Sequence, residues 1–324
     1  MRKVLALTFC LLAAAIATTA GSARAETWPA RPVKMIVGFA PGGPTDLVAR
    51  LLAQSLTAQT GKNFFIENVS GAGGNIGTVR AEQSAPDGYT VLVTGGNLTN
   101  NVFLFGHPGF DPLKDFEAVT LAAATPVVLA VNPSVPVHTV KELVDLIRAN
   151  PGKYSFASPG TGTPPQLVGS LFAHALKLDL VHVPFGGGEP AVEATVGGHT
   201  PISFGALAPA VPLIKSGALR ALAVTGKARA PTLPDVPTMA EAGYPEVVGA
   251  TWTAVVVPAG TPKDIVAKLH DMIVGGLAQA DVKAKLAAMA YVGIGNTPEE
   301  CTQYFKDEMA TWGKVIKDAG LHAE

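Results

Sequence analysis

The amino-acid sequence predicts an α/β protein of two domains, each a mainly parallel sheet flanked by helices. Short apolar runs bounded by glycine and proline alternate with segments whose apolar residues recur at helical spacing. This alternation is typical of right-handed βαβ units around an open parallel sheet. The 324 residues are enough for two hydrophobic cores, and the 35 glycines and 26 prolines are scattered rather than gathered in low-complexity segments.

Residues 1–25 have the parts of a secretory signal peptide. A basic start is followed by an almost wholly apolar stretch from Val4 to Ala20, and Ala23-Arg24-Ala25 provides small residues at positions −3 and −1 of a cleavage site. The apolar stretch is short for a membrane span, and no stop-transfer flank follows it. We therefore expect cleavage after Ala25 and a periplasmic location.

The remaining chain gives no sign of a nucleic-acid or membrane partner. Its formal net charge is −4, because the cleaved segment carries three basic residues and the whole chain has −1. Such a mildly acidic chain has no electrostatic reason to bind nucleic acid or an anionic membrane. Cys301 is its only cysteine, so an intramolecular disulfide is excluded. We expect a monomer without a metal or cofactor.

The first strand and helix illustrate the repeating pattern. Residues 33–39 are an apolar run between prolines, which suits a strand buried on both faces, and residues 44–59 have apolar side chains at helical spacing. Further strands are expected at 63–67, 89–94, 117–121, 126–131, 154–157, 180–183, 201–204, 218–224 and 251–257, and further helices at 73–83, 139–149, 164–177, 188–196, 208–215, 262–278, 281–290 and 297–318.

Four helix starts carry capping signals. In each, a threonine at the expected N-cap is followed three residues later by an acidic or amide side chain that can return a hydrogen bond. Proline at the first helical position supports three of these starts, because the N–H group that proline lacks would have no intrahelical acceptor at that position. The pairs are Thr139 with Glu142, Thr163 with Gln166, Thr261 with Asp264, and Thr297 with Glu300; the prolines are Pro164, Pro262 and Pro298.

The domain boundaries are predicted where the chain crosses between domains. With crossovers at Thr125-Pro126 and Gly249-Ala250, residues 26–124 and 250–324 form one discontinuous domain and residues 125–249 the other. Two connecting strands then act as a hinge that lets the domains close on a ligand. The alternative is two consecutive domains with a break near residue 150.

A glycine-rich turn at residues 38–46 is the first candidate binding site. It joins a strand end to a helix start, where backbone N–H groups and the helix dipole favour an anion. Pro44 removes one donor and leaves those of the two preceding glycines and Thr45. Asp46 either caps its own helix or repels an anion, so a ligand carboxylate here needs a bridging water or a protonated partner.

Residues 158–166 repeat this design with a strand end, a glycine-rich turn and proline at the first helical position. Three hydroxyls and two glycines offer donors without charge. A single turn of this kind is weak evidence for a site, whereas one in each domain can hold opposite parts of an acidic molecule. We therefore expect the two turns to face each other.

Motifs of catalysis and nucleotide binding are missing from the sequence. The glycines of residues 71–77 lack the spacing of a dinucleotide-binding turn, and neither a P-loop nor a serine-hydrolase elbow is present. The seven histidines show no metal-binding spacing. His182 is more typical of a hydrogen-bonded strand residue than of a catalyst. The sequence therefore favours a binding protein over an enzyme.

Several motifs in register along the whole mature chain carry a resemblance to a known family. They include Trp28-Pro-Ala-Arg-Pro32, the turn at 38–46, Gly71-Ala-Gly-Gly-Asn-Ile-Gly77, Ala85-Pro-Asp-Gly-Tyr89, Leu233-Pro-Asp-Val-Pro-Thr238 and Pro258-Ala-Gly-Thr-Pro262. In these motifs the chain is similar to the Bug-type family, the extracytoplasmic solute-binding components of tripartite tricarboxylate transporters.

The resemblance implies a type II-like Venus-flytrap fold, the two-domain fold of periplasmic binding proteins, with the ligand between the domains. It implies that one ligand carboxylate is held at residues 41–46, largely by backbone groups and bridging waters, with further contacts near 94–97, 158–166 and 204–206. The expected substrate-binding residues are Phe39, Pro41, Gly42, Gly43, Thr45, Asp46, Asn97, Ser158, Thr161, Gly162, Thr163, Gln166, Phe204 and Gly205.

Three positions depart from the family's usual pattern: Gln166 stands where histidine is common, Gly205 where aspartate is common, and Gly186 where lysine is frequent. Each departure reduces charge near the expected site. We therefore expect a ligand less charged than citrate, such as a monocarboxylate, an aromatic acid or a dicarboxylate with an apolar body. The resemblance implies delivery of this ligand to membrane transporter subunits; the alternative is presentation of the liganded protein to a sensor kinase.

Overall fold

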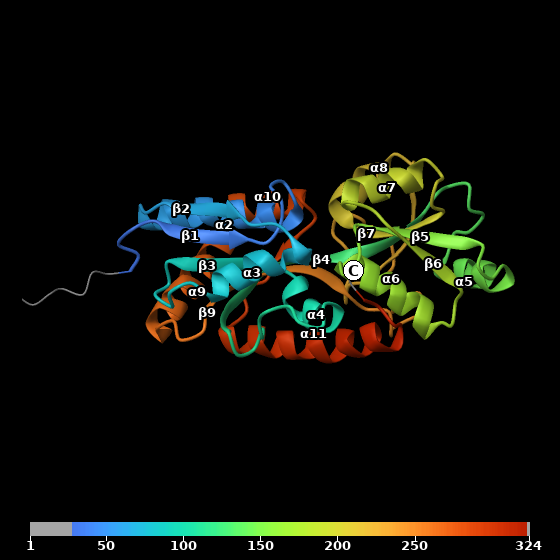
Figure 1. The fold of residues 1–324 in the computed structure, drawn as a ribbon. Coiled ribbons are helices and arrows are strands. Elements are labelled where there is room, and N and C mark those ends of the chain that lie inside the picture. Colours follow the sequence, from blue (N-terminus) through green and yellow to red (C-terminus); the bar gives the residue numbers. More distant parts are fainter. Residues whose placement is uncertain (1–27, 323–324) are drawn as a thin grey trace, which may run out of the picture.

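The computed structural model describes residues 28–322 and places them in two lobes side by side (Figure 1). The predicted signal peptide, residues 1–25, lies outside the described residues. Strands and helices alternate along most of the chain, so the predicted α/β class is confirmed. Between residues 28 and 322, no helix combines the length and the apolar character that a membrane crossing requires.

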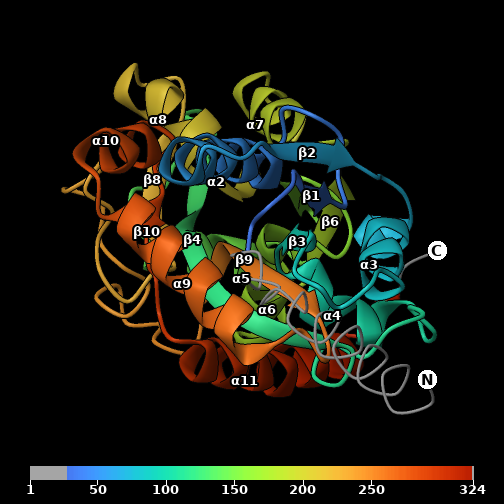
Figure 2. The ribbon, with the colours of Figure 1, turned by 90° about the vertical axis from the view of Figure 1, so that its left-hand side faces the viewer.

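The first lobe is a sheet with helices on both faces. Its elements are β1 (Val33–Val37), α2 (Pro44–Thr60), β2 (Phe64–Asn68), η1 (Ala72–Gly74), α3 (Asn75–Glu82), β3 (Thr90–Thr94), α4 (Asn97–Leu104), β9 (Ala250–Pro258), α9 (Lys263–Leu277), α10 (Ala280–Ala288), β10 (Val292–Gly293) and the start of α11 (Pro298–Asp318). Strands β2, β1 and β3 run in parallel. Helices α2, α9 and α10 bury one face of the sheet, and α3, α4 and α11 bury the other (Figure 2).

The second lobe repeats this layered arrangement. Its elements are α5 (Val140–Ala149), β5 (Tyr154–Ser158), α6 (Pro164–Ala175), β6 (Leu180–Pro184), α7 (Gly188–Val196), β7 (Ile202–Ala206), α8 (Leu207–Lys215) and β8 (Arg220–Val224). Strands β6, β5 and β7 are parallel. Helices α5 and α6 cover one face, and α7 and α8 cover the other.

Two antiparallel strands connect the lobes. Strand β4 (Phe116–Val131) runs from the first lobe into the second, and β9 returns beside it with Thr125 opposite Thr251. The two strands predicted at 117–121 and 126–131 are therefore one strand of 16 residues. Register shifts after Ala118 and after Leu121 bend β4 within the first lobe without breaking it.

Parallel pairing is confined to the outer strands of each lobe. The inner pairs β3–β9, β9–β4 and β4–β7 are antiparallel, because the chain leaves the first lobe and comes back to it on neighbouring strands. The sheet is therefore mixed, where the sequence predicts a mainly parallel one.

Two of the four predicted capping pairs form. The Thr139 hydroxyl accepts a hydrogen bond from the Glu142 amide at 3.1 Å. At the start of α11 the Thr297 hydroxyl accepts from the Glu300 amide at 3.2 Å, and the Glu300 carboxylate accepts from the Thr297 amide at 3.0 Å. This reciprocal pair satisfies two donors that a helix end otherwise leaves free.

The other two pairs do not form. The hydroxyls of Thr163 and Thr261 donate instead to the carbonyls of Gly160 and Pro258, each at 2.7 Å. Pro262 is the N-cap of α9 rather than its first residue. Each threonine closes a turn of the preceding loop, an alternative that hydroxyl side chains commonly find beside a helix start.

Helix α11 spans both lobes (Figure 1). Cys301 and Phe305 pack in the first lobe, whereas Trp312 and Ile316 belong to the hydrophobic core of the second. Burial raises the pKa of the Cys301 thiol to about 12, so this cysteine stays protonated as a core residue.

A carboxylate on α11 is tied to the connecting strands. Glu308 Oε2 accepts hydrogen bonds from the indole N–H groups of Trp252, on β9, at 2.8 Å and of Trp312 at 3.0 Å. Burial raises the pKa of Glu308 above its ordinary value, and hydrogen bonds from Trp252, Trp312 and Tyr304 offset this rise only in part. The ionised side chain is therefore stabilised less in the folded protein than in the unfolded chain.

Substitution of Glu308 by glutamine is expected to stabilise the protein at pH 7, because the amide oxygen still accepts from both indoles without a buried charge. Both the folded and the unfolded carboxyl are protonated below about pH 4, so the gain should shrink as pH falls towards that value. Glu308→Leu leaves both indole donors unpaired and should cost about 1–3 kcal/mol for each. Urea unfolding at pH 7 and pH 4.5 measures these differences; a glutamine variant less stable than wild type at pH 7 contradicts this account.

Candidate ligand-binding site

The first predicted turn lies at the carboxyl end of β1 and begins α2. Gly42 has φ +85°, a conformation that favours glycine, and Gly43 is the N-cap. Pro44 is the first residue of the helix. The chain therefore reaches α2 with its first-turn N–H groups at the end of the parallel strands, where open α/β sheets bind ligands.

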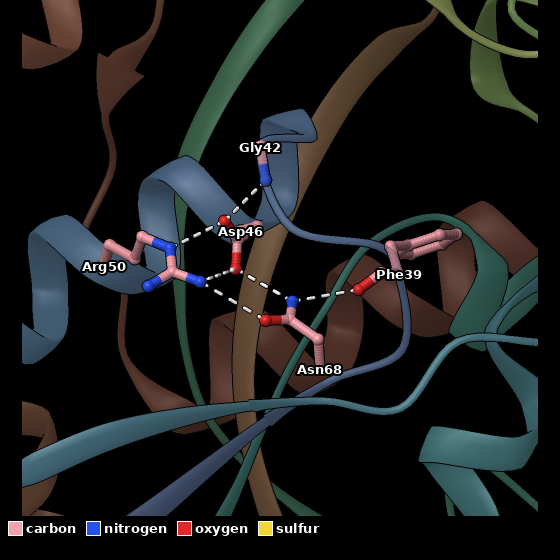
Figure 3. A network of polar contacts seen from close by, with 5 residues as sticks. All are labelled: Phe39, Gly42, Asp46, Arg50 and Asn68. Carbon is pink, nitrogen blue, oxygen red and sulfur yellow. Dashed lines mark hydrogen bonds and ion pairs between the residues drawn. The ribbon is translucent and has the colours of Figure 1, made fainter.

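Asp46 organises this turn (Figure 3). Its Oδ2 accepts from the Gly42 amide at 2.8 Å and from Arg50 Nε at 2.7 Å, and its Oδ1 accepts from Arg50 Nη2 at 3.1 Å and from Asn68 Nδ2 at 2.9 Å. Asn68 Nδ2 also donates to the Phe39 carbonyl at 2.9 Å. The Asp46 side chain is 0% exposed, and each of its oxygens accepts two hydrogen bonds. This carboxylate therefore holds the turn in place and has no acceptor position left for a ligand.

The network also decides the charge of Asp46. Burial alone would raise its pKa, but the hydrogen bonds from Arg50, Gly42 and Asn68, together with the Arg50 charge, hold the pKa below its ordinary value. Asp46 is therefore ionised and paired with the guanidinium of Arg50. The repulsion that the sequence predicts between Asp46 and a bound anion is offset within the lobe, without a protonated partner.

Three donors of the turn remain free. Within the described residues, the amides of Gly43 and Thr45 and the Thr45 hydroxyl have no protein acceptor. The Gly42 amide, which was expected to contact the ligand, donates to Asp46 instead. The turn thus presents a small group of N–H and O–H donors, with the positive end of the α2 dipole behind them.

The second predicted turn has the same geometry as the first. Gly162 has φ +80° and donates its amide to Gln166 Oε1 at 3.2 Å, as Gly42 does to the residue four positions later. Gln166 Nε2 donates in turn to Ser170 Oγ at 2.8 Å. Gln166 is buried, so it supports the turn rather than facing a ligand.

Ser158 and His182 form a pair beneath this turn. Ser158 Oγ lies 2.7 Å from His182 Nε2 and accepts from the Gly160 amide at 3.2 Å. Burial lowers the pKa of His182 to about 4, so the ring is neutral at physiological pH. Within the described residues no carboxylate bonds the other ring nitrogen, so the triad logic of a serine nucleophile is not met. His182 is a hydrogen-bonded strand residue, as the sequence predicts.

The start of α4 brings the two turns together. A Cβ atom placed on Gly95 would lie 3.9 Å from Thr45 Oγ1 of the first turn, and one placed on Gly96 would lie 3.0 Å from Pro164 Cγ of the second. Asn97 follows directly, with its Oδ1 accepting from the Gly95 amide at 3.1 Å. Both turns therefore flank the same dipeptide, as the sequence predicts for a shared site.

Other predicted site residues differ in their surroundings. Pro41 and Thr161 are exposed on the two turns, and the partly buried Phe39 ring lies beside Gly74. Phe204 is not available to a ligand: its ring is fully buried among the aromatic residues of the second core, 5.4 Å from Phe156 between centroids. The remaining expected residue, Gly205, is buried on β7.

A shallow groove of about 880 Å³ runs along α4 and α11. Phe103 and Gly313 contribute to its largely apolar lining, and none of the predicted site residues does. No metal-binding cluster of histidine, cysteine, aspartate or glutamate occurs among residues 28–322.

Comparison with known proteins decides the family. The model of the tripartite tricarboxylate transporter family receptor matches residues 48–321. The chain belongs to this receptor family. Protein BugT of Bordetella pertussis is 35% identical over 94% of both chains. Receptors of this family bind solutes and are not enzymes, in agreement with the expectation from the sequence.

Solved structures of similar proteins share the receptor's fold. The periplasmic binding protein BugD is 34% identical and superposes with a TM-score of 0.79 over 92% of this chain and 100% of its own. Rpa4515 of R. palustris, solved with adipate, is 33% identical with a TM-score of 0.82 over 91% and 99%. MatC of Rhodopseudomonas palustris, solved with bound malate, is 33% identical with a TM-score of 0.79 over 89% and 100%.

Several polar atoms of the receptor are buried without a partner where the lobes meet. Asn97 Nδ2 and Asn100 Nδ2 on α4, and the hydroxyls of Thr125 and Thr251 on the connecting strands, make no hydrogen bond within residues 28–322. Burying such a group unpaired costs about 1–3 kcal/mol. An arrangement of the lobes in which water or a ligand reaches these atoms would remove that cost.

Sequence reasoning missed three residues of the receptor's site. Arg50 has a visible signal, because it lies four residues after Asp46 on one face of the helix. Asn68 and Asn100 have no signal in their neighbouring residues, because the network and α4 arise from contacts between elements distant in the sequence.

Substitution of Asp46 by asparagine is expected to lower the free energy of unfolding of the receptor by about 1–3 kcal/mol at pH 7. The Arg50 pairing adds little to this, because that side chain is half exposed and screened by solvent. A folded pKa below the unfolded one stabilises the protein above about pH 4, and the difference between variants should disappear as pH falls through the folded value. Asp145→Asn breaks an exposed pair and serves as the control, with an expected change below about 0.5 kcal/mol. Equal effects of the two variants in urea unfolding contradict the role given to Asp46.

Proposed function

We propose that this receptor is a periplasmic solute-binding protein that captures a small carboxylate between its two lobes and delivers it to a tripartite tricarboxylate-type transporter in the membrane. The observation that carries the proposal is the pairing of Asp46 with Arg50, which leaves the N–H groups of the α2 start free for an anion. The relatives solved with adipate and malate support a carboxylic acid as the ligand class.

The carboxylate is proposed to bind at the first turn. Gly43 and Thr45 offer two amides and a hydroxyl, and the α2 dipole adds a partial positive charge. Asn97 and the partly buried Phe39 border the same position from α4 and from the end of β1. The turn at residues 158–166 supplies the opposite wall, with Thr161 as its exposed hydroxyl.

We assign residues 26–124 with 250–324 to one domain and residues 125–249 to the other, as the sequence predicts. The register of β4 with β9 supports this division, because Pro126 lies opposite Ala250 where both strands pass between the lobes. Ligand contacts to both lobes then stabilise a closed arrangement. Helix α11 adds a third connection, since it packs against both cores.

Removal of the Thr45 hydroxyl is expected to weaken carboxylate binding by about tenfold or more, because a hydrogen bond to a charged group contributes about 1.5–3 kcal/mol. Isothermal titration calorimetry of wild type and Thr45→Val with malate, adipate and benzoate measures this loss. Thr302→Val is the matched control, since that hydroxyl bonds only a carbonyl of its own helix. If wild type binds none of a broad panel of acids, or if Thr45→Val and Thr302→Val bind equally well, the proposed function is wrong.

Ligand binding is also expected to make the protein more compact. Small-angle X-ray scattering with and without a saturating acid should show a smaller radius of gyration in the bound state, because the domains close about the connecting strands. An unchanged scattering curve with a bound acid contradicts hinge closure while leaving the binding site itself intact.

A further inference from the structure

The two turns are alike in backbone geometry but differ in the donors that they leave free. In the first turn a single proline, Pro44, precedes Thr45, whose amide and hydroxyl are both unpaired. In the second turn the corresponding positions are Pro164 and Pro165, and neither has an N–H group. The start of α6 therefore lacks the donors with which the start of α2 can hold an anion.

Most other donors of the second turn are already used. The Gly162 amide bonds Gln166, the Thr163 hydroxyl donates to the Gly160 carbonyl, and the Gly160 amide bonds Ser158. The amide and the exposed hydroxyl of Thr161 have no partner within the described residues. Two neutral donors on a loop, without free N–H groups at the helix start behind them, suit an uncharged polar group better than they stabilise a second carboxylate.

The charged side chains near the two turns also favour a carboxylate at the first turn over one at the second. Residues 38–46, 94–101, 158–166 and 184–189 contain no lysine, arginine or histidine. In the first turn the one acidic side chain is neutralised by Arg50. Beside the second turn, α7 carries Glu189 in its first turn, and no cation pairs with Glu189 among residues 28–322.

Glu189 belongs to the segment that packs on the second turn. The Phe185 amide donates to the Ser158 carbonyl at 3.0 Å, and a Cβ atom on Gly160 would lie 3.2 Å from the Phe185 carbonyl oxygen. Helix α7 begins three residues later, with Glu189 at its second position and Pro190 at its third. His182, the remaining titratable group at this turn, is neutral because burial lowers its pKa to about 4. An exposed carboxylate without an ion-pair partner among residues 28–322 thus follows closely on the segment that packs against the second turn.

We propose that the ligand carries a single carboxylate, held at the first turn, and that its other end is uncharged and lies against the second turn. This inference rests on the proposed function, because it names which acids the same site prefers. It assigns discrimination to the second lobe: Pro164 and Pro165 withhold donors there, and Glu189 repels a second negative charge.

The test compares each dicarboxylate with its monoamide, because the two have nearly the same shape and differ in charge at one end. Calorimetric titrations of wild type use succinate with succinamate, adipate with adipamate, and terephthalate with its monoamide. The monoamide is expected to bind at least about tenfold more tightly in each pair that binds. A carboxylate that is removed from water without a cation beside it costs more free energy than an amide in the same place. A dicarboxylate that binds as tightly as its monoamide would overturn the inference.

A charge-removing variant tests the part given to Glu189. Glu189→Gln should raise the affinity for the dicarboxylates several-fold and leave the affinity for the monoamides unchanged. The difference in affinity between each dicarboxylate and its monoamide therefore becomes smaller. Glu193→Gln, one turn further along α7 and also exposed, is the control and should change neither. If this difference in affinity is the same in Glu189→Gln as in wild type, Glu189 does not repel the second carboxylate. Failure of all six compounds to bind wild type would count against the proposed function itself, whereas tight binding of the dicarboxylates would count only against the single-carboxylate preference.

Discussion

Between the lobes the chain runs as two hydrogen-bonded antiparallel strands, and this pairing positions every other part of the site. Strand β9 lies between β3 and β4, so it is at once an inner strand of the first sheet and the return path from the second lobe. Gly95 packs directly on the Trp252 carbonyl of β9, which fixes the start of α4 against the crossing point. The two glycine turns then meet on either side of α4, although each ends a strand one place further out: β1 lies beside β3, and β5 lies beside β7.

The two turns show how one backbone design serves different electrostatic purposes. In both, a glycine with positive φ donates its amide to a side chain four residues later, which locks the entry to the helix. The acceptor is ionised Asp46 in one turn and neutral Gln166 in the other. Only the first needs a cation, and Arg50 supplies it from the next turn of the same helix. Asp46 is thus a structural part of a site for anions, and its pairing with Arg50 explains why an acidic side chain can lie beside a bound anion.

Local sequence patterns predict most of the fold and part of the site. The alternation of strands and helices, the glycine turns and the capping pair at Thr297 follow from near-neighbour chemistry, and all are present. Helix α4 escapes prediction because three asparagines in eight residues disfavour a helix that only tertiary burial stabilises. The unbroken course of β4 and the burial of Phe204 also depend on partners far away in the sequence. Which predicted donors are free, and which are occupied, could be read only from the folded turns.

The interleaved order of the strands has a consequence for how the molecule assembles during synthesis. The sheet of the first lobe needs β9, and one face of that sheet needs α11, so a nascent chain that stops before residue 250 exposes the unpaired edges of β3 and β4. The second lobe can form its parallel strands earlier, while the amino-terminal half waits for residues that emerge last. Pairing over such long separations is slow, so the first lobe stays incomplete until the strand and the helix that finish it have been synthesised.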